Sequence, residues 1–205
     1  MKILIATNNS HKIQEINKIA GEWVIPEKLE KIQFVLPQKL NINLNPNEIY
    51  HTFEENSKLK AKEFFNAAKI PTIADDSGLE IEVLNNAPGV HSARFAGDLD
   101  VPRIAQDKAN RDKVLNLLKN ETNRKAKFRT VLAFFDGNAV KYFVGECKGQ
   151  IIDEERGENG FGYDSIFIPD GFDKTFAEMN DNEKNKISHR YFAVRAFCEM
   201  LNNNT

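Results

Sequence analysis

The sequence has few cysteines, no long apolar run and almost no net charge, and each of these absences excludes a class of protein. Cys147 and Cys198 are the only cysteines among 205 residues, too few for a disulfide scaffold and in keeping with a reducing cytoplasmic setting. No stretch approaches the ~20 apolar residues of a membrane span, and the apolar run at residues 2–6 is too short for a signal peptide. A net charge of −2 argues against a nucleic-acid binder. We therefore expect a cytoplasmic globular protein without a membrane or nucleic-acid partner.

Short apolar runs alternate with segments of helical periodicity along the chain. The apolar runs predict strands at residues 2–6, 32–36, 70–73, 79–83, 128–135, 139–147, 150–152 and 166–168. The periodic segments predict helices at about residues 13–20, 52–68, 103–119 and 188–201, with Gly21 ending the first. Residues 85–97 and 153–160 are expected to be loops. This alternation, with a hairpin signal at Asp136-Gly137-Asn138, predicts one α/β domain over residues 1–205 with a mixed sheet.

Two adjacent carboxylates, Asp75 and Asp76, follow one predicted strand and precede another. Adjacent strand residues point to opposite faces, so only one of the two is expected to face a given cleft. Acidic oxygens at such a place suit a divalent cation. The alternative is an Asx-turn that joins two strands without any chemistry.

Basic residues stand at two predicted helix starts: His11 and Lys12 at the first helix, His189 and Arg190 at the last. A cation at a helix N-terminus is unfavourable by about 0.3–1 kcal/mol. An anion bound there would reverse that cost, because backbone N–H groups and the helix dipole add to the attraction. The alternatives are a solvated Lys12, a buried hydrogen-bonded His189 and a surface ion pair at Arg190. Ser188 could be only a helix cap.

An aromatic segment, Phe161-Gly162-Tyr163-Asp164, combines flat rings with polar groups and a glycine that permits close approach. Such a combination suits a nucleobase. In a chain with 15 phenylalanines, core packing is the competing interpretation. The sequence has no Walker A motif, no Gly-x-Ser-x-Gly motif, and no histidines at zinc-ligand spacing.

These segments have the order found in one family. They are Ala6-Thr7-Asn8-Asn9-Ser10-His11-Lys12, Phe53-Glu54-Glu55-Asn56, Lys60-Ala61, Ala74-Asp75-Asp76-Ser77-Gly78-Leu79, Ala87-Pro88-Gly89-Val90, Ser92-Ala93-Arg94, Gly160-Phe161-Gly162-Tyr163-Asp164 and Glu183-Lys184-Asn185-Lys186-Ile187-Ser188-His189-Arg190. From end to end the chain resembles the inosine triphosphate/xanthosine triphosphate pyrophosphatase family. It departs from the family at Asn8, where glycine is commonest. Because asparagine tolerates a left-handed backbone, the loop can keep its shape.

The resemblance implies a Mg²⁺-dependent hydrolase that converts ITP, dITP or XTP to the monophosphate and pyrophosphate. It also implies an elongated mixed sheet flanked by helices, two lobes with a central cleft, and a homodimer.

By the same resemblance, Asp76 is the proton acceptor and a magnesium ligand. Asp75 is the weaker candidate, and Glu48 and Glu55 occupy positions where the family has acidic residues near the cation. The residues that the resemblance places on the substrate are Thr7, Asn8, Asn9, Ser10, His11, Lys12, Ser77, Phe161, Gly162, Tyr163, Asp164, Lys184, His189 and Arg190. In this scheme residues 7–12 hold phosphates with Lys12 as the charged contact, Phe161 stacks on the base, and Lys184, His189 and Arg190 recognise it.

Three alternatives stay open at this stage. The enzyme could act on modified pyrimidine or methylated nucleotides instead, or the chain could be a non-catalytic nucleotide sensor. A nucleic-acid-binding module is the third, and near-neutral charge disfavours it. A base such as Asp76 argues against a sensor, because binding alone needs no proton acceptor.

Overall fold

The computed structural model describes residues 1–203, which form two compact units. Of the described residues, the first unit comprises 1–76, 130–145 and 189–203, and the second comprises 77–129 and 146–188. Strand β3 (Thr72–Ile81) passes from the first unit to the second directly after Asp76. The two predicted aspartates therefore both belong to the first unit.

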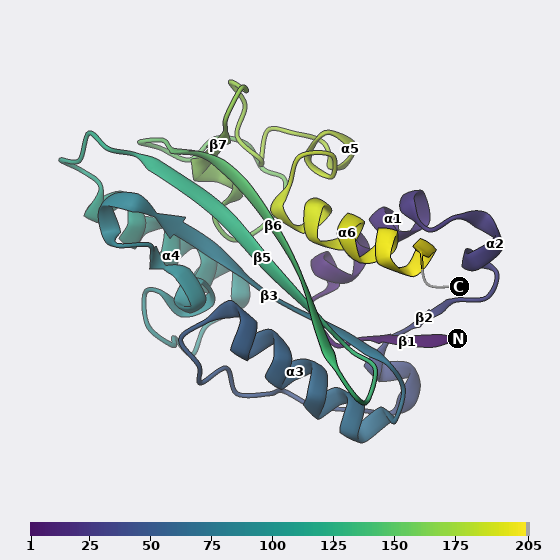
Figure 1. The fold of residues 1–205 in the computed structure, drawn as a ribbon. Coiled ribbons are helices and arrows are strands. Elements are labelled where there is room, and N and C mark those ends of the chain that lie inside the picture. Colours follow the sequence, from purple (N-terminus) through teal and green to yellow (C-terminus); the bar gives the residue numbers. More distant parts are fainter. Residues whose placement is uncertain (204–205) are drawn as a thin grey trace. The chain divides into compact units, whose positions relative to one another are not determined.

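The remaining elements follow the predicted alternation of strand and helix (Figure 1). The other strands are β1 (Lys2–Ile5), β2 (Gln33–Val35), β4 (Ala87–Pro88), β5 (Lys125–Phe135), β6 (Val140–Ile151) and β7 (Phe167–Pro169). The α-helices are α1 (Ser10–Trp23), α2 (Pro26–Leu29), α3 (Phe53–Ala68), α4 (Arg103–Leu117), α5 (Asp181–Lys184) and α6 (His189–Asn203). Four short 3₁₀ helices are η1 (Pro37–Leu40), η2 (Glu82–Leu84), η3 (Gly89–Arg94) and η4 (Asp164–Ile166).

The strands form a mixed sheet in the order β2-β1-β3-β5-β6-β7, with β4 paired to β3. Strand β1 runs parallel to both β2 and β3, whereas the β3–β4 and β6–β7 pairs are antiparallel. The predicted α/β class with a mixed sheet is therefore confirmed.

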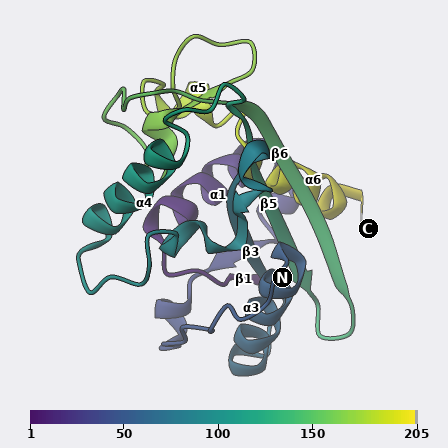
Figure 2. The same ribbon diagram turned by 90° about the vertical axis from the view of Figure 1, so that its left-hand side faces the viewer.

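The first unit consists of helices on both faces of its strands. In β1, Ile3 and Ile5 pack with residues of α1 and α6, whereas Leu4 packs toward α3. In β3, Ile73 joins the first of these clusters and Ala74 joins the second. Figures 1 and 2 show α1 and α6 on one side of these strands and α3 on the other. The period of two along a strand thus assigns each side chain to one helix layer.

The second unit has a core of its own around Phe128, Phe167 and Phe176. The rings of Phe128 and Phe167 meet edge to face with their centroids 4.8 Å apart. Helix α4 contributes Val114 to this core, and the start of the second unit contributes Leu79. Much of the phenylalanine excess in the sequence is thus used for packing.

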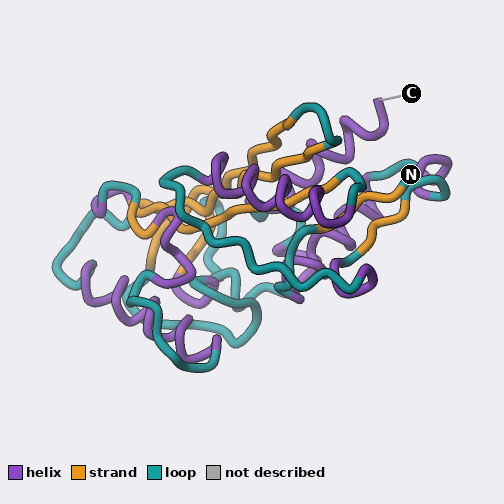
Figure 3. The backbone as a smooth tube through the Cα atoms, turned by 90° about the horizontal axis from the view of Figure 1, so that it is seen from below, coloured by secondary structure: helices purple, strands orange, loops and turns teal. Residues whose placement is uncertain are grey.

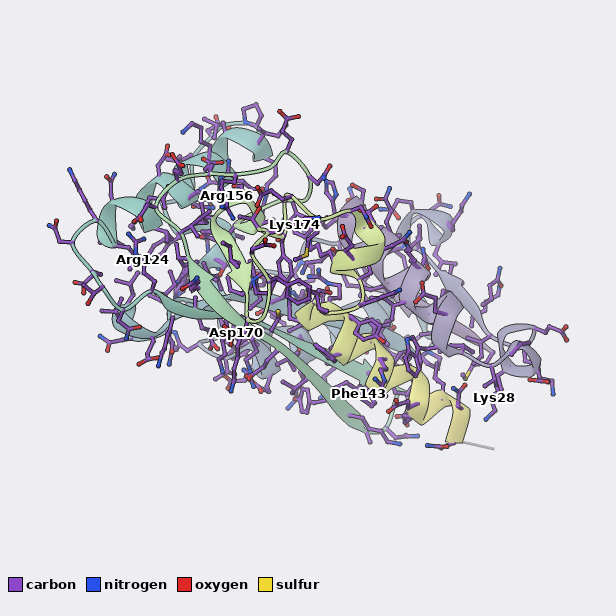
Figure 4. All side chains as sticks on the ribbon, turned by 90° about the horizontal axis from the view of Figure 1, so that it is seen from above. Lys28, Arg124, Phe143, Arg156, Asp170 and Lys174 are labelled. Carbon is purple, nitrogen blue, oxygen red and sulfur yellow. The ribbon has the colours of Figure 1, made fainter. Side chains whose placement is uncertain are left out.

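The C-terminal helix α6, which belongs to the first unit, is held at its far end by contacts with α2 and β6. Lys28, labelled in Figure 4, donates from Nζ to the carbonyl oxygens of Leu201 and Asn202 at 3.0 and 2.8 Å. Phe143, also labelled there, lies on β6 with its ring centroid 5.6 Å from that of Phe197 on α6. These contacts fix the helix that begins with His189 and Arg190.

Several predicted boundaries are wrong. Helix α1 continues through Gly21 to Trp23, because the apolar residues that pack in the core extend to Val24. Residues 150–152 do not form a separate strand, because β6 runs without interruption to Ile151. Residues 85–97 contain β4 and η3 rather than loop alone. Figure 3 shows the long hairpin of β5 and β6 as two orange segments joined by a turn.

In the described part of the chain, no helix is both long and apolar enough to cross a membrane.

Candidate active site

Strand β3 runs unbroken through Asp75 and Asp76, so the Asx-turn alternative is wrong, and so is the prediction that the pair stands at a strand end. Side chains alternate along the strand. Asp75 continues the face of Ile73 toward α1 and α6, and Asp76 continues the face of Ala74 toward α3. The two carboxylates therefore meet entirely different partners.

Asp75 forms an ion pair with one basic side chain from each of the two helices on its face. Its Oδ2 lies 3.0 Å from Nζ of Lys12 on α1 and 3.2 Å from Nη2 of Arg190 on α6. Arg190 also forms an ion pair with Glu15, one turn after Lys12 on α1. The side chains of Asp75 and Arg190 are 1% and 2% exposed. A buried network of alternating charges thus joins β3, α1 and α6.

The charges of this network shift each other's proton affinity. Burial alone would raise the pKa of Asp75, but Lys12 and Arg190 outweigh it and hold that pKa far below its usual range. Burial lowers the pKa of Lys12, although Asp75 opposes this change. The pKa of Arg190 is raised because Glu15 and Asp75 outweigh its burial. Asp75 and Arg190 are therefore both ionised at neutral pH.

Asp76 belongs to a second cluster, which has more negative than positive charge. Its Oδ1 lies 3.5 Å from Nζ of Lys60 on α3, and that ammonium lies 2.5 Å from Glu48. Burial raises the pKa of Asp76, Lys60 opposes this, and Glu48 and Asp75 raise it further. Burial lowers the pKa of Lys60, but Asp76 and Glu48 outweigh it, so this pKa is raised. Asp76 is thus a carboxylate whose affinity for a proton is increased by its surroundings.

Lys60 was not predicted as a site residue, although the sequence carries a signal for it. It falls on the buried face of α3 with Phe53, Ser57 and Phe64, at the spacing of one helical stripe. A lysine within such a stripe needs a carboxylate partner. Glu15 carries a similar signal: it is an acidic residue on α1 one turn from Lys12 and beside the buried Ile16, so it needs a basic partner.

The loop that carries Glu48 is held by Asn56, a buried residue of α3. Its side chain accepts from the backbone N–H of Tyr50 at 3.0 Å and donates to the carbonyl oxygen of Tyr50 at 3.1 Å. Glu55 instead helps to cap α3: its carboxylate accepts a hydrogen bond from the hydroxyl of Thr52 at the start of the helix. The structure therefore brings Glu48, and not Glu55, to the carboxylate–lysine cluster.

A divalent cation fits the chemistry of this cluster. In the described residues, no three acidic, histidine or cysteine side chains gather in a ready-made metal site. Glu48 and Asp76 nevertheless supply carboxylate oxygens, the ligands that hard cations prefer. Burial raises the pKa of Asp76, and repulsion from Glu48 adds to this rise. A further positive charge would reduce this repulsion.

Residues 7–12 form the connection from β1 into α1. The Asn9 side chain caps the helix, accepting from the backbone N–H groups of His11 and Lys12 at 3.0 and 3.3 Å. The hydroxyl of Thr7 accepts from the N–H of Asn9, and Ser10 and His11 are exposed. Part of the donor set that was predicted for phosphate is therefore engaged by the chain's own cap.

Asn8 does not adopt the left-handed backbone that its glycine-like position suggested, since its φ is not among the positive values in residues 1–203. Instead its side chain donates to the carbonyl oxygen of Leu44 and accepts from Gln38, both at 3.1 Å. The loop is therefore held by side-chain bonds that glycine could not make.

The start of α6 is buried. Ser188, His189 and Arg190 are 1%, 6% and 2% exposed. Strand β6 passes so close that a Cβ atom on Gly145 would come within 2.0 Å of the His189 carbonyl oxygen. The anion expected at this cationic helix start includes the protein's own carboxylates, Asp75 and Glu15.

The second unit contains the aromatic segment. Asp164 accepts from Nζ of Lys184 at 2.8 Å and from the backbone N–H of Phe161 at 2.9 Å. The Lys184 ammonium lies 5.1 Å from the centroid of the Phe161 ring. Tyr163 is buried, and its hydroxyl donates to the carbonyl oxygen of Ser92 at 2.8 Å. Among residues 161–164, Phe161 and Gly162 are thus the partly exposed ones.

The chain has clear relatives. Residues 3–200 match the Ham1 family. The chain belongs to that family. The dITP/XTP pyrophosphatases of Aquifex aeolicus and Porphyromonas gingivalis are both 42% identical to it, over 99% and 98% of this chain and 98% and 97% of their own. The fold of this chain also matches that of solved Ham1 structures. The Staphylococcus aureus Ham1 protein superposes with a TM-score of 0.86, at 36% identity and full coverage of both chains.

Ser77 is half-buried in β3 directly after Asp76. The family match covers every residue that was predicted for the site, but it assigns no role to any of them.

Proposed function

We propose that this Ham1-family protein hydrolyses non-standard purine nucleoside triphosphates (ITP, dITP and XTP) to the monophosphate and pyrophosphate. In this way it would remove them from the nucleotide pool. We further propose that residues 1–205 act as one functional domain. Support comes from the dITP/XTP pyrophosphatase names of relatives matched over nearly the whole chain. The observation that carries the proposal is the cluster of Asp76, Lys60 and Glu48, which combines a carboxylate of raised proton affinity with a cation.

Asp76 is the proton acceptor in this mechanism. A general base works best when its pKa approaches the operating pH, and burial together with Glu48 moves the pKa of Asp76 in that direction. Lys60 opposes the rise in the pKa of Asp76 and holds its Oδ1 in place. Asp76 would thus orient an attacking water and accept its proton.

Mg²⁺ is the proposed cofactor, with Asp76 and Glu48 as the residues that would hold it. When bound, such an ion offsets negative charge on a triphosphate and on leaving pyrophosphate. Both carboxylates already share Lys60, so their side chains converge without the metal.

Residues 7–12 are proposed to bind phosphate oxygens, with Lys12 as the charged contact and Ser77 as a further hydroxyl donor. Lys12 is 16% exposed at its side chain and is held by Asp75. A tethered ammonium loses less conformational entropy on binding than a free surface lysine does.

Recognition of the base is assigned to Phe161, Lys184, His189 and Arg190, together with the segment of Gly162, Tyr163 and Asp164. Phe161 would stack on the purine. Hypoxanthine and xanthine have a 6-oxo acceptor where adenine has an amino donor. Cationic and N–H donors satisfy the first and leave the second unpaired, which can give strong discrimination.

Pyrophosphate release from ITP, XTP, dITP, GTP and ATP, each with and without Mg²⁺, tests the proposal. We expect Mg²⁺-dependent release from the first three at a kcat/KM at least about 100-fold above that for ATP. Release of orthophosphate, or equal rates on all five nucleotides, would reject it.

A cytoplasmic homodimer is the proposed state of the protein, by its resemblance to the family. Light scattering of the purified chain across a concentration series, together with fractionation of its host cells, examines the two parts of this proposal. A monomer at all concentrations, or recovery with membranes, would contradict them.

A further inference from the structure

Helix α4 contains none of the predicted site residues, yet its polar side chains bind the backbone of two other segments of the second unit. Asp107 and Arg111 bind Gly162, and Gln106 and Asn110 bind residues 92–99. Gln106, Asp107 and Asn110 are 7%, 6% and 2% exposed. Buried polar groups are costly unless they are hydrogen-bonded, so these side chains are committed to the backbone that they hold.

Both backbone polar groups of Gly162 are hydrogen-bonded to side chains of α4. Its N–H donates to Oδ2 of Asp107 at 3.2 Å, and its carbonyl oxygen accepts from Nη1 of Arg111 at 2.9 Å. Asp107 and Arg111 are one helical turn apart, so they project from the same face of α4. One acceptor and one donor thus fix the orientation of the backbone between Phe161 and Tyr163.

Both side chains are themselves oriented by ion pairs. Nε of Arg103 lies 2.9 Å from Oδ1 of Asp107, and Nε of Arg111 lies 2.8 Å from Oε2 of Glu155. Gly162 has φ +64°, a left-handed conformation that most side chains rarely adopt. A backbone in that conformation keeps it only where its surroundings determine it, and Asp107 and Arg111 provide those surroundings.

The other polar residues of α4 extend the same support. Asn110 donates to the carbonyl oxygens of Ser92 and Ala93 at 3.3 and 3.1 Å. The carbonyl of Ser92 is also the acceptor for the hydroxyl of Tyr163. The two residues that follow Gly162 are also held: Tyr163 by the Ser92 carbonyl that Asn110 binds, and Asp164 by Lys184.

We propose that Asp107 and Arg111 are positioning residues that set the orientation of Phe161 for stacking on the nucleobase. The inference rests on the proposed function, because it concerns how the same nucleotide is held. Neither residue needs to touch the substrate. Their effect passes through the backbone of Gly162 to the partly exposed residue before it, Phe161.

The test compares two pairs of residues one position apart on α4. Asp107→Ala and Arg111→Ala remove the bonds to Gly162. Lys108→Ala and Asp112→Ala remove a neighbouring i,i+4 ion pair at 2.9 Å whose side chains are 62% and 49% exposed. Each variant is assayed for KM and kcat with ITP. Binding of ITP and of inorganic triphosphate is measured by calorimetry in EDTA.

We expect Asp107→Ala and Arg111→Ala to raise the KM for ITP about tenfold or more, with kcat changed less than about threefold. Their affinity for inorganic triphosphate should equal that of the native chain. Asp107→Asn keeps an oxygen acceptor for the Gly162 N–H and should restore the native KM. The Lys108 and Asp112 controls should match the native chain throughout.

Amide hydrogen exchange supplies a readout that does not depend on turnover. The Gly162 N–H should exchange faster in Asp107→Ala than in the native chain, whereas amides of β5 should not. Equal KM values for the Asp107, Arg111 and control variants on an active native enzyme would overturn the inference. So would equal losses of ITP and triphosphate binding.

A native chain that binds ITP but does not hydrolyse it would reject only the proposed function. The calorimetric comparison would then still decide the role of α4. A native chain that does not bind ITP at all would reject both.

Discussion

Asp75 and Asp76 are neighbours in one strand, yet their surroundings are opposite. Asp75 faces two cations in a network whose charges alternate, and its pKa is driven down. Asp76 shares Lys60 with a second carboxylate, Glu48, and its pKa is driven up chiefly by burial. The pleat of β3 is enough to separate a carboxylate that stabilises the fold from one suited to proton transfer.

Removal of the charge of Asp75 and removal of the charge of Asp76 should change the free energy of unfolding in opposite directions. Removing one member of a compensated buried ion pair leaves an uncompensated charge and costs about 3–5 kcal/mol. Removing a carboxylate whose charge is disfavoured chiefly by burial, as at Asp76, relieves a desolvation cost instead. Substituting asparagine, which is close in shape, at each position therefore separates stability from catalysis.

The largest expected effect is that of Asp76→Asn on turnover. Loss of a general base costs about 10²–10⁴-fold in kcat. Because the amide removes a charge that burial disfavours, the free energy of unfolding in EDTA should equal or exceed that of the native chain. Initial rates of pyrophosphate release from XTP and urea unfolding measure the two quantities. Near-native turnover in this variant would disprove the role of Asp76.

Asp75→Asn should do the opposite and lower the free energy of unfolding by about 3–5 kcal/mol, because Lys12 and Arg190 stay buried beside a neutral amide. Urea unfolding at several pH values checks this. The folded pKa of Asp75 lies below its unfolded value, so the carboxylate stabilises the fold above about pH 4 and this contribution is lost as the pH falls. A constant difference between native and variant down to pH 3 would contradict the network.

A smaller effect is expected from divalent cation, which should raise the thermal stability of the protein through Asp76 and Glu48. Mg²⁺ at about 100 times its dissociation constant stabilises a folded protein by about 2.7 kcal/mol. Thermal unfolding of the native chain should shift upward with Mg²⁺ and return on addition of EDTA. Asp76→Asn should show little shift and Glu48→Gln a reduced one. An equal Mg²⁺ shift in the native chain and both variants would place the metal elsewhere.

The smallest effect is expected at Asp136, an exposed carboxylate in the β5–β6 turn. Its pKa is also lowered, because it accepts from the backbone N–H groups of Ala139 and Asn138, both at 2.8 Å. Solvent screens such a group, so Asp136→Asn should cost less than about 1 kcal/mol above pH 4, and less still below it. A loss as large as that of Asp75→Asn would show that burial does not set the difference.

The strands and helices were largely predictable because their signals are local. The stripe of Ile13, Ile16 and Ile19 predicted α1, and the apolar face around Phe64 predicted α3. The opposite orientation of Asp75 and Asp76 also followed from the period of a strand. The unbroken course of β3 did not, because an Asp-Asp-Ser-Gly run is typical of a turn and only the sheet around it forces extension.

The partners of the site residues were less predictable, since they are far apart in sequence. Arg190 lies 115 residues from Asp75 and 175 residues from Glu15. No local pattern encodes such a pairing. Lys60 and the polar residues of α4 were missed for a related reason: a charged side chain on a helix is usually solvated, and only the packing of the helix shows that it is buried.

The most direct test is a carboxyl ¹³C NMR titration of Asp75 and Asp76 in metal-free buffer, with Asp136 as an exposed reference. The expected result is that Asp76 titrates above the usual aspartate value of about 3.9, while Asp75 stays ionised to the lowest pH at which the protein is folded. If Asp75 and Asp76 titrate together, or Asp75 takes up its proton first, the division of roles between these neighbours is wrong.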